Sequence, residues 1–416
     1  MAERSIAVIG GGISGLTAGY ILSRTGRVTL FEADDRLGGH ADTHLVGSGR
    51  LPVDTGFIVY NERTYPLLTR LFAELGVTTR ASDMSMSVSC SGCGVRYAGK
   101  RGVAGLGAGV PRGGVRYLRM LTEVPRFHRA ARRVLETGTS GDLPVGEFLR
   151  AAGFSGYFAA HFAIPLVAAV WSCPPGTAMD YPAGYLFAFL ANHGMLSVTG
   201  SPQWRTVRGG SRRYVERIAA RLHEVRLSAP VRSVRRHPDG VEVRDASGRE
   251  TGFDAAVIAT HPDQALALLD PPTDAEKAVL GAFGYTANRA VLHTDSRLLP
   301  ASPATRASWN YSLACRGTGS GRARISYHLN RLLGLPPDPG YIVTLGGADD
   351  VDPELVIATM DYAHPAYTRE SVAAQRRLPG LNTPVTSFAG AYQGWGFHED
   401  GCRSGVAAAR ALGGTW

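Results

Sequence analysis

The chain has 416 residues, of which 44% are hydrophobic and 19% charged, and its formal net charge is +9. A chain of this length and composition can bury a large core and is expected to form two domains. Only two of the 44 basic residues, Lys100 and Lys277, are lysine, and the arginines are scattered along the chain. This pattern argues against nucleic-acid binding, but it permits peripheral contact with an anionic membrane surface.

The first 32 residues have the pattern of a dinucleotide-binding unit. An apolar strand at residues 6–9 leads into a G-x-G-x-x-G turn and a helix, and a second strand at residues 27–31 ends at an acid, 20 residues after the second glycine of the motif. In such a unit the glycines allow a tight turn, close approach of a pyrophosphate and close helix–strand packing, while the acid binds a ribose hydroxyl. The predicted cofactor-binding residues are Gly10, Gly12, Ile13, Ser14, Gly15 and Glu32.

The next residues favour FAD over NAD. Glu32 continues as E-x-x-x-R-x-G-G, and a further glycine follows in the stretch 53–57. An NAD site needs no arginine and glycine pair just past the ribose acid, whereas the pyrophosphate and ribityl chain of FAD continue over this loop. A guanidinium and exposed backbone amides here can bind the oxygens of FAD, and a glycine lets the backbone lie against its flat ring. The residues predicted to contact FAD here are Ala33, Arg36, Gly38, Gly39, His40, Thr55, Gly56 and Phe57.

The five cysteines do not form a disulfide framework, because their number is odd. Cys90 and Cys93 form the only C-x-x-C, and no second pair or histidine cluster in the sequence completes a zinc site, so no metal is predicted. We interpret the pair as ordinary hairpin thiols in a reducing cytosol, with a redox-active pair as the alternative. No targeting segment is found, and the expected location is the cytoplasm.

Two apolar stretches, residues 158–171 and 181–195, are predicted to form buried helices that wall a substrate pocket. The first is shorter than the ~20 residues that a membrane-spanning helix needs. His193, at the end of the second stretch, is a candidate for contact with a polar group of the substrate, as is Asn192.

The remaining elements return the chain to the FAD domain and then leave it again. A hairpin around Asp239-Gly240, beginning near Val231, and a buried strand at 255–259 are expected in the FAD domain. Alternating segments between 288 and 345 predict an antiparallel sheet in the other domain. The C-terminal region repeats strand, glycine-rich turn and helix, and its helix N-terminus would stabilise a reduced, anionic flavin ring. The residues predicted to lie at the flavin from these segments are Val231, Gly390, Gly396, Phe397, His398 and Gly401.

The fold class predicted from these elements is α/β. A discontinuous Rossmann-like FAD-binding domain of the glutathione-reductase type is assigned to residues 1–84, 205–275 and 375–416. An α+β substrate-binding domain with an antiparallel sheet is assigned to residues 85–204 and 276–374.

With these blocks, the chain resembles the flavin-containing amine oxidase and phytoene desaturase superfamily, and most of all a bacterial subgroup of predicted FAD/NAD-binding oxidoreductases. It shares with that subgroup the stretches 53–57, 203–210 and 396–401. The resemblance implies non-covalent FAD, because no cysteine falls where some relatives attach flavin, although His40 and His364 are left as candidates for a covalent link. It also implies a flavin-facing role for Phe397.

The departures from amine oxidases concern the substrate. Many amine oxidases place a lysine near flavin N5, and the matching position here is Asn288. One of the two tyrosines of the amine-binding cage is replaced by Phe397, and the other falls near Thr359 or Pro365. The predicted catalytic residues are therefore Phe397 and Asn288, from the resemblance, and His193, from its place at the end of the apolar stretch, without the parts that oxidise an amine.

The predicted function is that of an FAD-dependent dehydrogenase or desaturase that takes hydride from a largely apolar substrate, such as a lipid, acyl chain or polyketide, to flavin N5. Oxygen or another carrier is the expected electron acceptor, because no second nucleotide motif is found. Two alternatives stay open: an amine or amino-acid oxidase with an altered site, and a double-bond isomerase without net redox. The sequence does not specify the oligomeric state.

Overall fold

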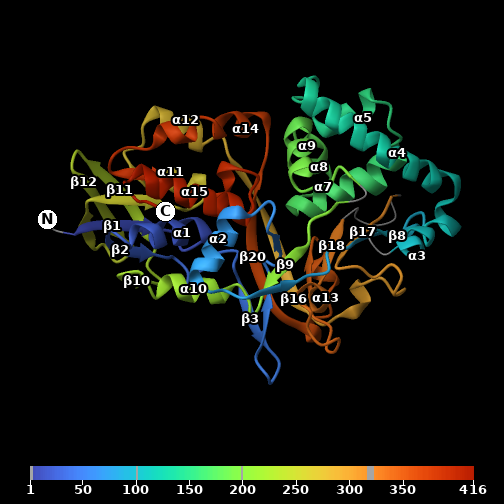
Figure 1. Ribbon diagram of the computed structural model, residues 1–416, viewed down its shortest axis with the longest axis horizontal. Coiled ribbons are helices and arrows are strands. Elements are labelled where there is room, and N and C mark those ends of the chain that lie inside the picture. The colour runs from blue at the N-terminus through green and yellow to red at the C-terminus, as the bar shows by residue number, and fades with distance from the viewer. Residues whose placement is uncertain (1–2, 100–101, 198–199, 316–322) are drawn as a thin grey trace.

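The computed structural model describes residues 3–99, 102–197, 200–315 and 323–416. Figure 1 shows two parts side by side, with both ends of the chain in the left-hand part. The left-hand part contains the predicted dinucleotide-binding unit. The right-hand part contains a larger sheet and a group of helices above it.

A five-stranded parallel sheet forms the centre of the first part, in the order β10-β2-β1-β14-β21. Its strands come from three distant regions of the chain, which confirms the predicted discontinuous FAD domain at the level of its sheet. They are β1 (Arg4–Ile9), β2 (Gly26–Phe31), β10 (Glu224–Arg226), β14 (Ala255–Ile258) and β21 (Thr386–Phe388). Residues 6–9 of β1 and all of β14 are buried, and both segments are entirely apolar, as expected for central strands covered on both faces.

Helices cover one face of this parallel sheet, and a second sheet with further helices covers the other. The helices α1 (Ile13–Leu22) and α15 (His398–Ala411) pack against each other, and α2 (Pro66–Leu75) and α10 (Arg212–Ala219) lie beside them. A second sheet contains the predicted hairpin: β11 (Val231–His237), β12 (Gly240–Asp245), β13 (Glu250–Phe253) and the short β15 (Leu269–Asp270). Three more helices belong to this part: α11 (Pro262–Leu268), α12 (Asp274–Leu280) and α14 (Arg369–Gln375).

A seven-stranded sheet forms the centre of the second part. In spatial order its strands are β20 (Val356–Ala366), β16 (Gly284–His293), β19 (Ile342–Leu345), β18 (Arg324–His328), β17 (Trp309–Leu313), β7 (Met86–Cys90) and β8 (Arg96–Gly99). The predicted antiparallel sheet is therefore present, but it is mixed, because β7 and β17 run parallel. This pair joins segments more than 200 residues apart in sequence, so no hairpin turn requires it to be antiparallel.

The helical group lies over the β17 end of this sheet (Figure 1). The longest helix of this group bends at Gly114, whose φ is +50°. The stretch 158–171 is not one regular helix, since a π-helical turn, η1, interrupts it. The helices are α3 (Gly102–Gly107), α4 (Val110–Thr137), α5 (Val145–Ala151), α6 (Gly156–Phe158), η1 (Ala159–Ala163), α7 (Ile164–Trp171), α8 (Pro175–Asp180) and α9 (Ala183–Asn192).

Short elements connect the two parts. They are the hairpin β3 (Thr43–Val46) and β4 (Leu51–Asp54), the small sheet of β5 (Tyr60–Asn61), β9 (Trp204–Val207) and β6 (Thr79–Ala81), and α13 (Leu329–Leu333). Among the described residues, no helix combines the length and the apolar character that a membrane crossing requires.

The buried clusters suggest a shift of two domain boundaries. Val279 and Phe283, which follow the predicted boundary at 275, pack in the same cluster as Phe388 and Val231 of the FAD part. Ala374, just before the boundary predicted at 375, packs there as well. We therefore propose that the FAD domain extends to about residue 283 and resumes near residue 368.

Candidate functional site

The glycine-rich turn between β1 and α1 has the geometry that a dinucleotide requires. Gly10 has a φ of +106°, and a Cβ atom there would lie 2.7 Å from the carbonyl oxygen of Ala259. A Cβ atom on Gly15 would overlap the Gly10 carbonyl oxygen, so this glycine permits the close helix–strand contact. A Cβ atom on Gly12 would meet no protein atom within 4 Å. The second glycine of the motif therefore faces space that a ligand can fill.

Glu32 lies directly beside this turn. One of its carboxylate oxygens accepts a hydrogen bond from the Gly11 amide at 2.7 Å, and the other accepts one from the Asp34 amide at 3.0 Å. Glu32 is half-buried, and each carboxylate oxygen has further acceptor capacity. The predicted ribose contact stays a prediction, and Glu32 also has a structural role that the sequence did not reveal. Ala33, the next residue, is exposed.

The loop with Arg36, Gly38 and Gly39 closes over the glycine-rich turn. The Gly38 amide donates to the Gly11 carbonyl at 2.8 Å, and a Cβ atom on Gly39 would lie 3.4 Å from the Gly12 Cα. Arg36 donates to the Gly39 carbonyl at 3.0 Å and pairs with Asp42 at 3.2 Å. We expected Arg36 to meet FAD oxygens directly. In the structure it holds the loop, and a contact with the cofactor stays a prediction.

His40 carries an unpaired buried atom at this loop. Its Nε2 has no hydrogen-bond partner among the described residues, and burial first, followed by the charge of His364, holds its pKa well below the usual range. The Phe57 amide donates to the His40 carbonyl at 2.6 Å, and a Cβ atom on Gly56 would overlap that carbonyl oxygen. Thr55 hydrogen-bonds the Tyr362 hydroxyl at 2.7 Å. The predicted residues 40 and 55–57 therefore lie together, around a polar atom that a ligand could satisfy.

The N-termini of α1 and α15 converge on the same region. A Cβ atom on Gly401 would lie 2.6 Å from Ile13 Cγ2 and 3.0 Å from Ser14 Oγ, so glycine allows the two helix starts to touch. The Gly390 amide donates to Ser404 of α15 at 2.9 Å. Two helix N-termini at one place favour negative charge, as found on a pyrophosphate and on a reduced flavin.

The side chains of His398 and Glu399 are structural. The His398 ring stacks on Phe57 with centroids 3.7 Å apart and hydrogen-bonds the Tyr214 hydroxyl at 2.9 Å. Burial lowers the pKa of His398 to about 3, so its ring is neutral. Glu399 accepts hydrogen bonds from the amides of Leu67 and Leu68, each at 3.0 Å, and thereby caps α2.

Val231, at the start of β11, lies two residues after Ala229, whose amide donates a hydrogen bond to the Glu32 carbonyl at 2.8 Å.

These observations fit FAD. An open face at Gly12, an unpaired His40 nitrogen and two converging helix N-termini surround one region between the glycine-rich turn and the loop at 36–40. The fold and this region together define a dinucleotide-binding protein.

Comparison with known proteins agrees with this class. The family model described as "Flavin containing amine oxidoreductase" matches residues 13–327, so the chain belongs to this family, and it is an FAD-dependent oxidoreductase.

Individual relatives match over different extents. A coproporphyrinogen III oxidase of Mycobacterium leprae is 46% identical over 84 residues, which are 19% of this chain and 18% of that protein. The chain thus matches less than a fifth of the length of this curated relative. A putrescine oxidase structure with bound putrescine has a TM-score of 0.68 at 16% identity and 99% coverage of both chains. A fatty acid isomerase from P. acnes has a TM-score of 0.67 at 16% identity and 97% coverage of both chains. The TM-scores of the two structures show that they share the fold of this chain.

An aromatic cluster lies in front of the α15 N-terminus. Phe397 stacks on Phe189 of α9 with ring centroids 4.9 Å apart, and His193 stacks on Phe189 at 4.1 Å. The Trp171 indole donates to the Trp395 carbonyl at 3.0 Å. The aromatic cluster comprises Trp171, Tyr181, Tyr185, Phe189, Tyr367, Trp395 and Phe397. The two predicted apolar stretches thus meet the glycine-rich C-terminal turn.

Trp395 and Tyr367 were missed by the sequence analysis. Trp395 lies between the two glycines of the Gly394-Trp395-Gly396 turn, which is a signal that could have indicated it. Tyr367 and Pro365 both approach Gly396: a Cβ atom there would lie 2.8 Å from the Tyr367 hydroxyl and 3.1 Å from Pro365 Cγ. The sequence suggested Thr359 or Pro365 for the second aromatic position, whereas the aromatic side chain that approaches Gly396 is Tyr367, which directly follows β20.

His193 is neutral in this setting. Burial lowers its pKa to about 4, and its Nδ1 lies 3.0 Å from the Phe189 carbonyl oxygen. This hydrogen bond places the proton on Nδ1 and leaves Nε2 as the acceptor nitrogen. The two candidates Phe397 and His193 are brought together, with ring centroids 5.9 Å apart.

Asn288 lies in a separate group of polar side chains. On β16 it faces Tyr362 of β20, and its amide nitrogen is 2.8 Å from Nδ1 of His364. His364 in turn contacts the ring of His40, with centroids 5.2 Å apart. Asn288 is therefore connected to the FAD loop through two histidines. Lys277 lies on α12 and pairs with Asp274 at 3.2 Å, while Lys100 lies outside the described residues.

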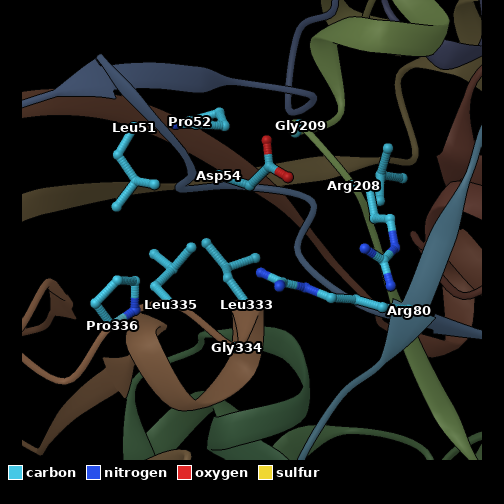
Figure 2. A pocket seen from close by; sticks show the side chains of 12 residues that line it. Leu51, Pro52, Asp54, Arg80, Arg208, Gly209, Leu333, Gly334, Leu335 and Pro336 are labelled. Carbon is cyan, nitrogen blue, oxygen red and sulfur yellow. The ribbon is translucent and has the colours of Figure 1, made fainter. Parts of the chain in front are cut away.

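A cavity of about 310 Å³ is lined by residues of β4, β6, β9 and α13 and of the segments next to them, and none of the residues predicted to hold FAD lines it (Figure 2). Asp54, Arg80 and Arg208 line it together with Leu333 and Leu335. It lies between the stretches 53–57 and 203–210, which the sequence analysis had singled out. Asp54 connects the first stretch to Ser211, the residue that follows the second stretch: it accepts the Ser211 amide at 2.9 Å and the Ser211 hydroxyl at 2.8 Å.

Asp54 is expected to make stability depend on pH. Burial raises its pKa to about 6, from 3.8. Between these values the folded state binds more protons than the unfolded state, so stability falls as pH rises from about 4 to about 6. Asp54→Asn should reduce this fall by on the order of 1–3 kcal/mol. Urea unfolding at several pH values measures it.

The matched control for this prediction is the exposed Asp239. Asp239→Asn should leave the pH profile unchanged, and both proteins should keep the contribution of Asp400, whose pKa burial also raises to about 6. An Asp54→Asn profile identical to that of the unsubstituted protein would contradict the assignment.

Proposed function

We propose that this FAD-dependent oxidoreductase removes a hydride from a carbon atom of a largely apolar, uncharged substrate. Bound FAD supplies the hydride acceptor, its N5 atom. The observation that carries the proposal is the aromatic cluster in front of the α15 N-terminus. In addition, the nearby carboxylates of Glu399 and Asp400 are already hydrogen-bonded within the protein.

The aromatic cluster supports an apolar substrate. Most of its members come from the helical group, α7 to α9, and the others from the glycine-rich turn and the end of β20. Rings from three segments can hold a hydrocarbon chain or a polycycle by contact area, exclude water and fix the orientation of a C–H bond. In this proposal Phe397 and Phe189 position the substrate, and His193 accepts a hydrogen bond from a polar group at its end.

The nearby carboxylates argue against an ammonium substrate. Glu399 is occupied by two amides of α2. Asp400 accepts the Phe397 amide at 3.0 Å and a hydrogen bond from Arg403. A cationic amine would need a free acid or a complete aromatic cage to replace its hydration. The position that carries lysine in many amine oxidases is Asn288, whose side-chain amide hydrogen-bonds His364 instead.

The proposal is tested by the absorbance of oxidised flavin in the anaerobic holoprotein. Long-chain acyl compounds and polycyclic compounds are expected to include one that bleaches the flavin, whereas short primary amines, diamines and amino acids should leave it oxidised. Asn288→Lys should not create amine oxidation, because the cage is also incomplete. Asn288→Ala, which removes the same amide without adding a charge, is its control.

Two results would replace this function by another. Turnover of simple amines with peroxide production would favour an amine oxidase with an altered site. Conversion of an unsaturated substrate to a positional isomer, with neither net bleaching nor oxygen uptake, would favour an isomerase.

A further inference from the structure

Four metal-ligating side chains that are far apart in sequence meet in the second part of the molecule, away from the proposed FAD site. They are Cys90, Cys93, His161 and Cys315, and their ligand atoms all lie within 4.8 Å of one another. They come from β7 and the turn after it, from the π-helical turn η1, and from the residues that follow β17. In Figure 1 this is the region where β17 and β8 face the helical group.

We propose that this cluster is a structural zinc site with three cysteine ligands and one histidine ligand. Four protein ligands without an open position are the usual composition of structural zinc sites, and Cys₃His is one of the common sets. Tetrahedral ligands at ~2.3 Å from zinc lie ~3.8 Å apart, so the observed spread needs only small shifts to close on an ion. Thiolates together with one imidazole favour zinc over magnesium or calcium, which prefer oxygen.

The backbone around the cysteine pair has the form of a ligand-bearing turn. The Gly94 amide donates to the Cys90 carbonyl at 2.9 Å, and the Cys90 amide donates to the Val95 carbonyl at 2.9 Å. Gly94 has a φ of +76°, which brings the chain back immediately after Cys93. The parallel pairing of β7 with β17 sets Cys90 opposite Leu313, two residues before Cys315. The register of this pair therefore delivers the third cysteine.

The histidine is oriented as a metal ligand. His161 Nδ1 lies 3.1 Å from the Tyr157 carbonyl oxygen, which makes it the protonated nitrogen, and Nε2 points at Cys93 Sγ at 3.4 Å. A ligating histidine ordinarily donates its other ring N–H in this way. The Tyr157 ring stacks on His161 with centroids 4.0 Å apart, and the Tyr97 hydroxyl donates to the His161 carbonyl at 2.6 Å. The π-helical turn that presents His161 is a feature often found at functional positions.

The arrangement favours a metal over a redox-active pair. Redox cysteines of the C-x-x-C type are activated at helix N-termini or beside cations, whereas this pair lies in a β-hairpin turn. All five cysteines are free, and a disulfide would use only two of the four converging groups. An ion would join the sheet to the helical group through His161, and so stabilise the wall of the proposed substrate site.

The first experiment is metal analysis of the FAD-loaded protein, purified with reductant and without chelator from zinc-supplemented medium. We expect about one zinc per chain. Cys315→Ser and His161→Ala should each lose most of the zinc, and Cys402→Ser, which removes a buried cysteine in the FAD domain, should keep it. The flavin content of each preparation reports the FAD domain independently. Zinc far below one per chain in the unsubstituted protein, or zinc retained in both ligand variants, would overturn the site, as would iron in place of zinc.

A second measurement does not depend on the variants being able to fold. Protein produced with cobalt should show the long-wavelength absorption of tetrahedral, thiolate-bound Co(II), beyond the flavin bands. Absence of that spectrum in cobalt-grown, FAD-loaded protein would refute a tetrahedral thiolate site.

Discussion

Gly12→Ala is expected to abolish most FAD binding while leaving the protein folded. The added Cβ atom meets no protein atom within 4 Å, and Gly12 has an extended backbone, with a φ of −73°, that alanine adopts readily. The methyl group would instead occupy the face where we expect the pyrophosphate to approach. We expect affinity for FAD to fall on the order of a hundredfold, which corresponds to ~2.7 kcal/mol. Titration of the apoprotein with FAD, followed by flavin fluorescence, measures this change.

The matched control is Gly252→Ala on β13, where an added Cβ atom likewise meets nothing within 4 Å. Both variants should unfold within about 0.5 kcal/mol of the unsubstituted apoprotein, as expected for surface substitutions without a named defect. Unchanged FAD affinity in Gly12→Ala would show that the cofactor does not approach this face.

Glu399→Ala is expected to destabilise the protein strongly. Its carboxylate, 7% exposed, satisfies the amides of Leu67 and Leu68 at the first turn of α2, whose N-cap residue Tyr65 offers no side-chain cap. Removal would leave both donors without their partner, and such groups cost ~1–3 kcal/mol each when buried. We expect a decrease of several degrees in the melting temperature, measured by circular dichroism.

Two further variants separate the loss of the hydrogen bonds to α2 from the effect of removing any glutamate side chain. Glu399→Gln keeps one acceptor oxygen and should lie between the alanine variant and the unsubstituted protein. Glu136→Ala, at an exposed position near the end of α4, should be neutral. A melting temperature of Glu399→Ala within about 1 °C of the unsubstituted protein would contradict the capping role.

Local patterns predicted the elements of the FAD domain well. The strands β1, β2 and β14 and the helix α1 lie where the apolar runs and the glycines indicated them. Gly10 has a left-handed backbone with a φ of +106°, and Gly15 packs against the Gly10 carbonyl oxygen, so both glycines answer to residues close in sequence. The membership of the flavin-containing amine oxidoreductase family confirms the inferred cofactor.

The structural roles of charged residues were less visible in the sequence. Glu399 was considered only as part of a helix start near the flavin, and its actual partners are 331 and 332 residues away. His398 stacks on Phe57 because two distant loops meet, and nothing in either segment specifies that contact. The identity of the second aromatic position near Gly396 depended on the register of β20, where a shift of one residue exchanges the two faces.

The sequence by itself thus determined the dinucleotide-binding unit, because a tight turn, a helix start and an acid at a set distance are properties of adjacent residues. Only the tertiary structure decided that Cys90 and Cys93 lie with His161 and Cys315. A parallel pairing between β7 and β17 and a π-helical turn bring these four residues together, and neither leaves a local pattern. The physical reason is that long-range contacts follow from strand register and packing, which depend on the whole chain at once.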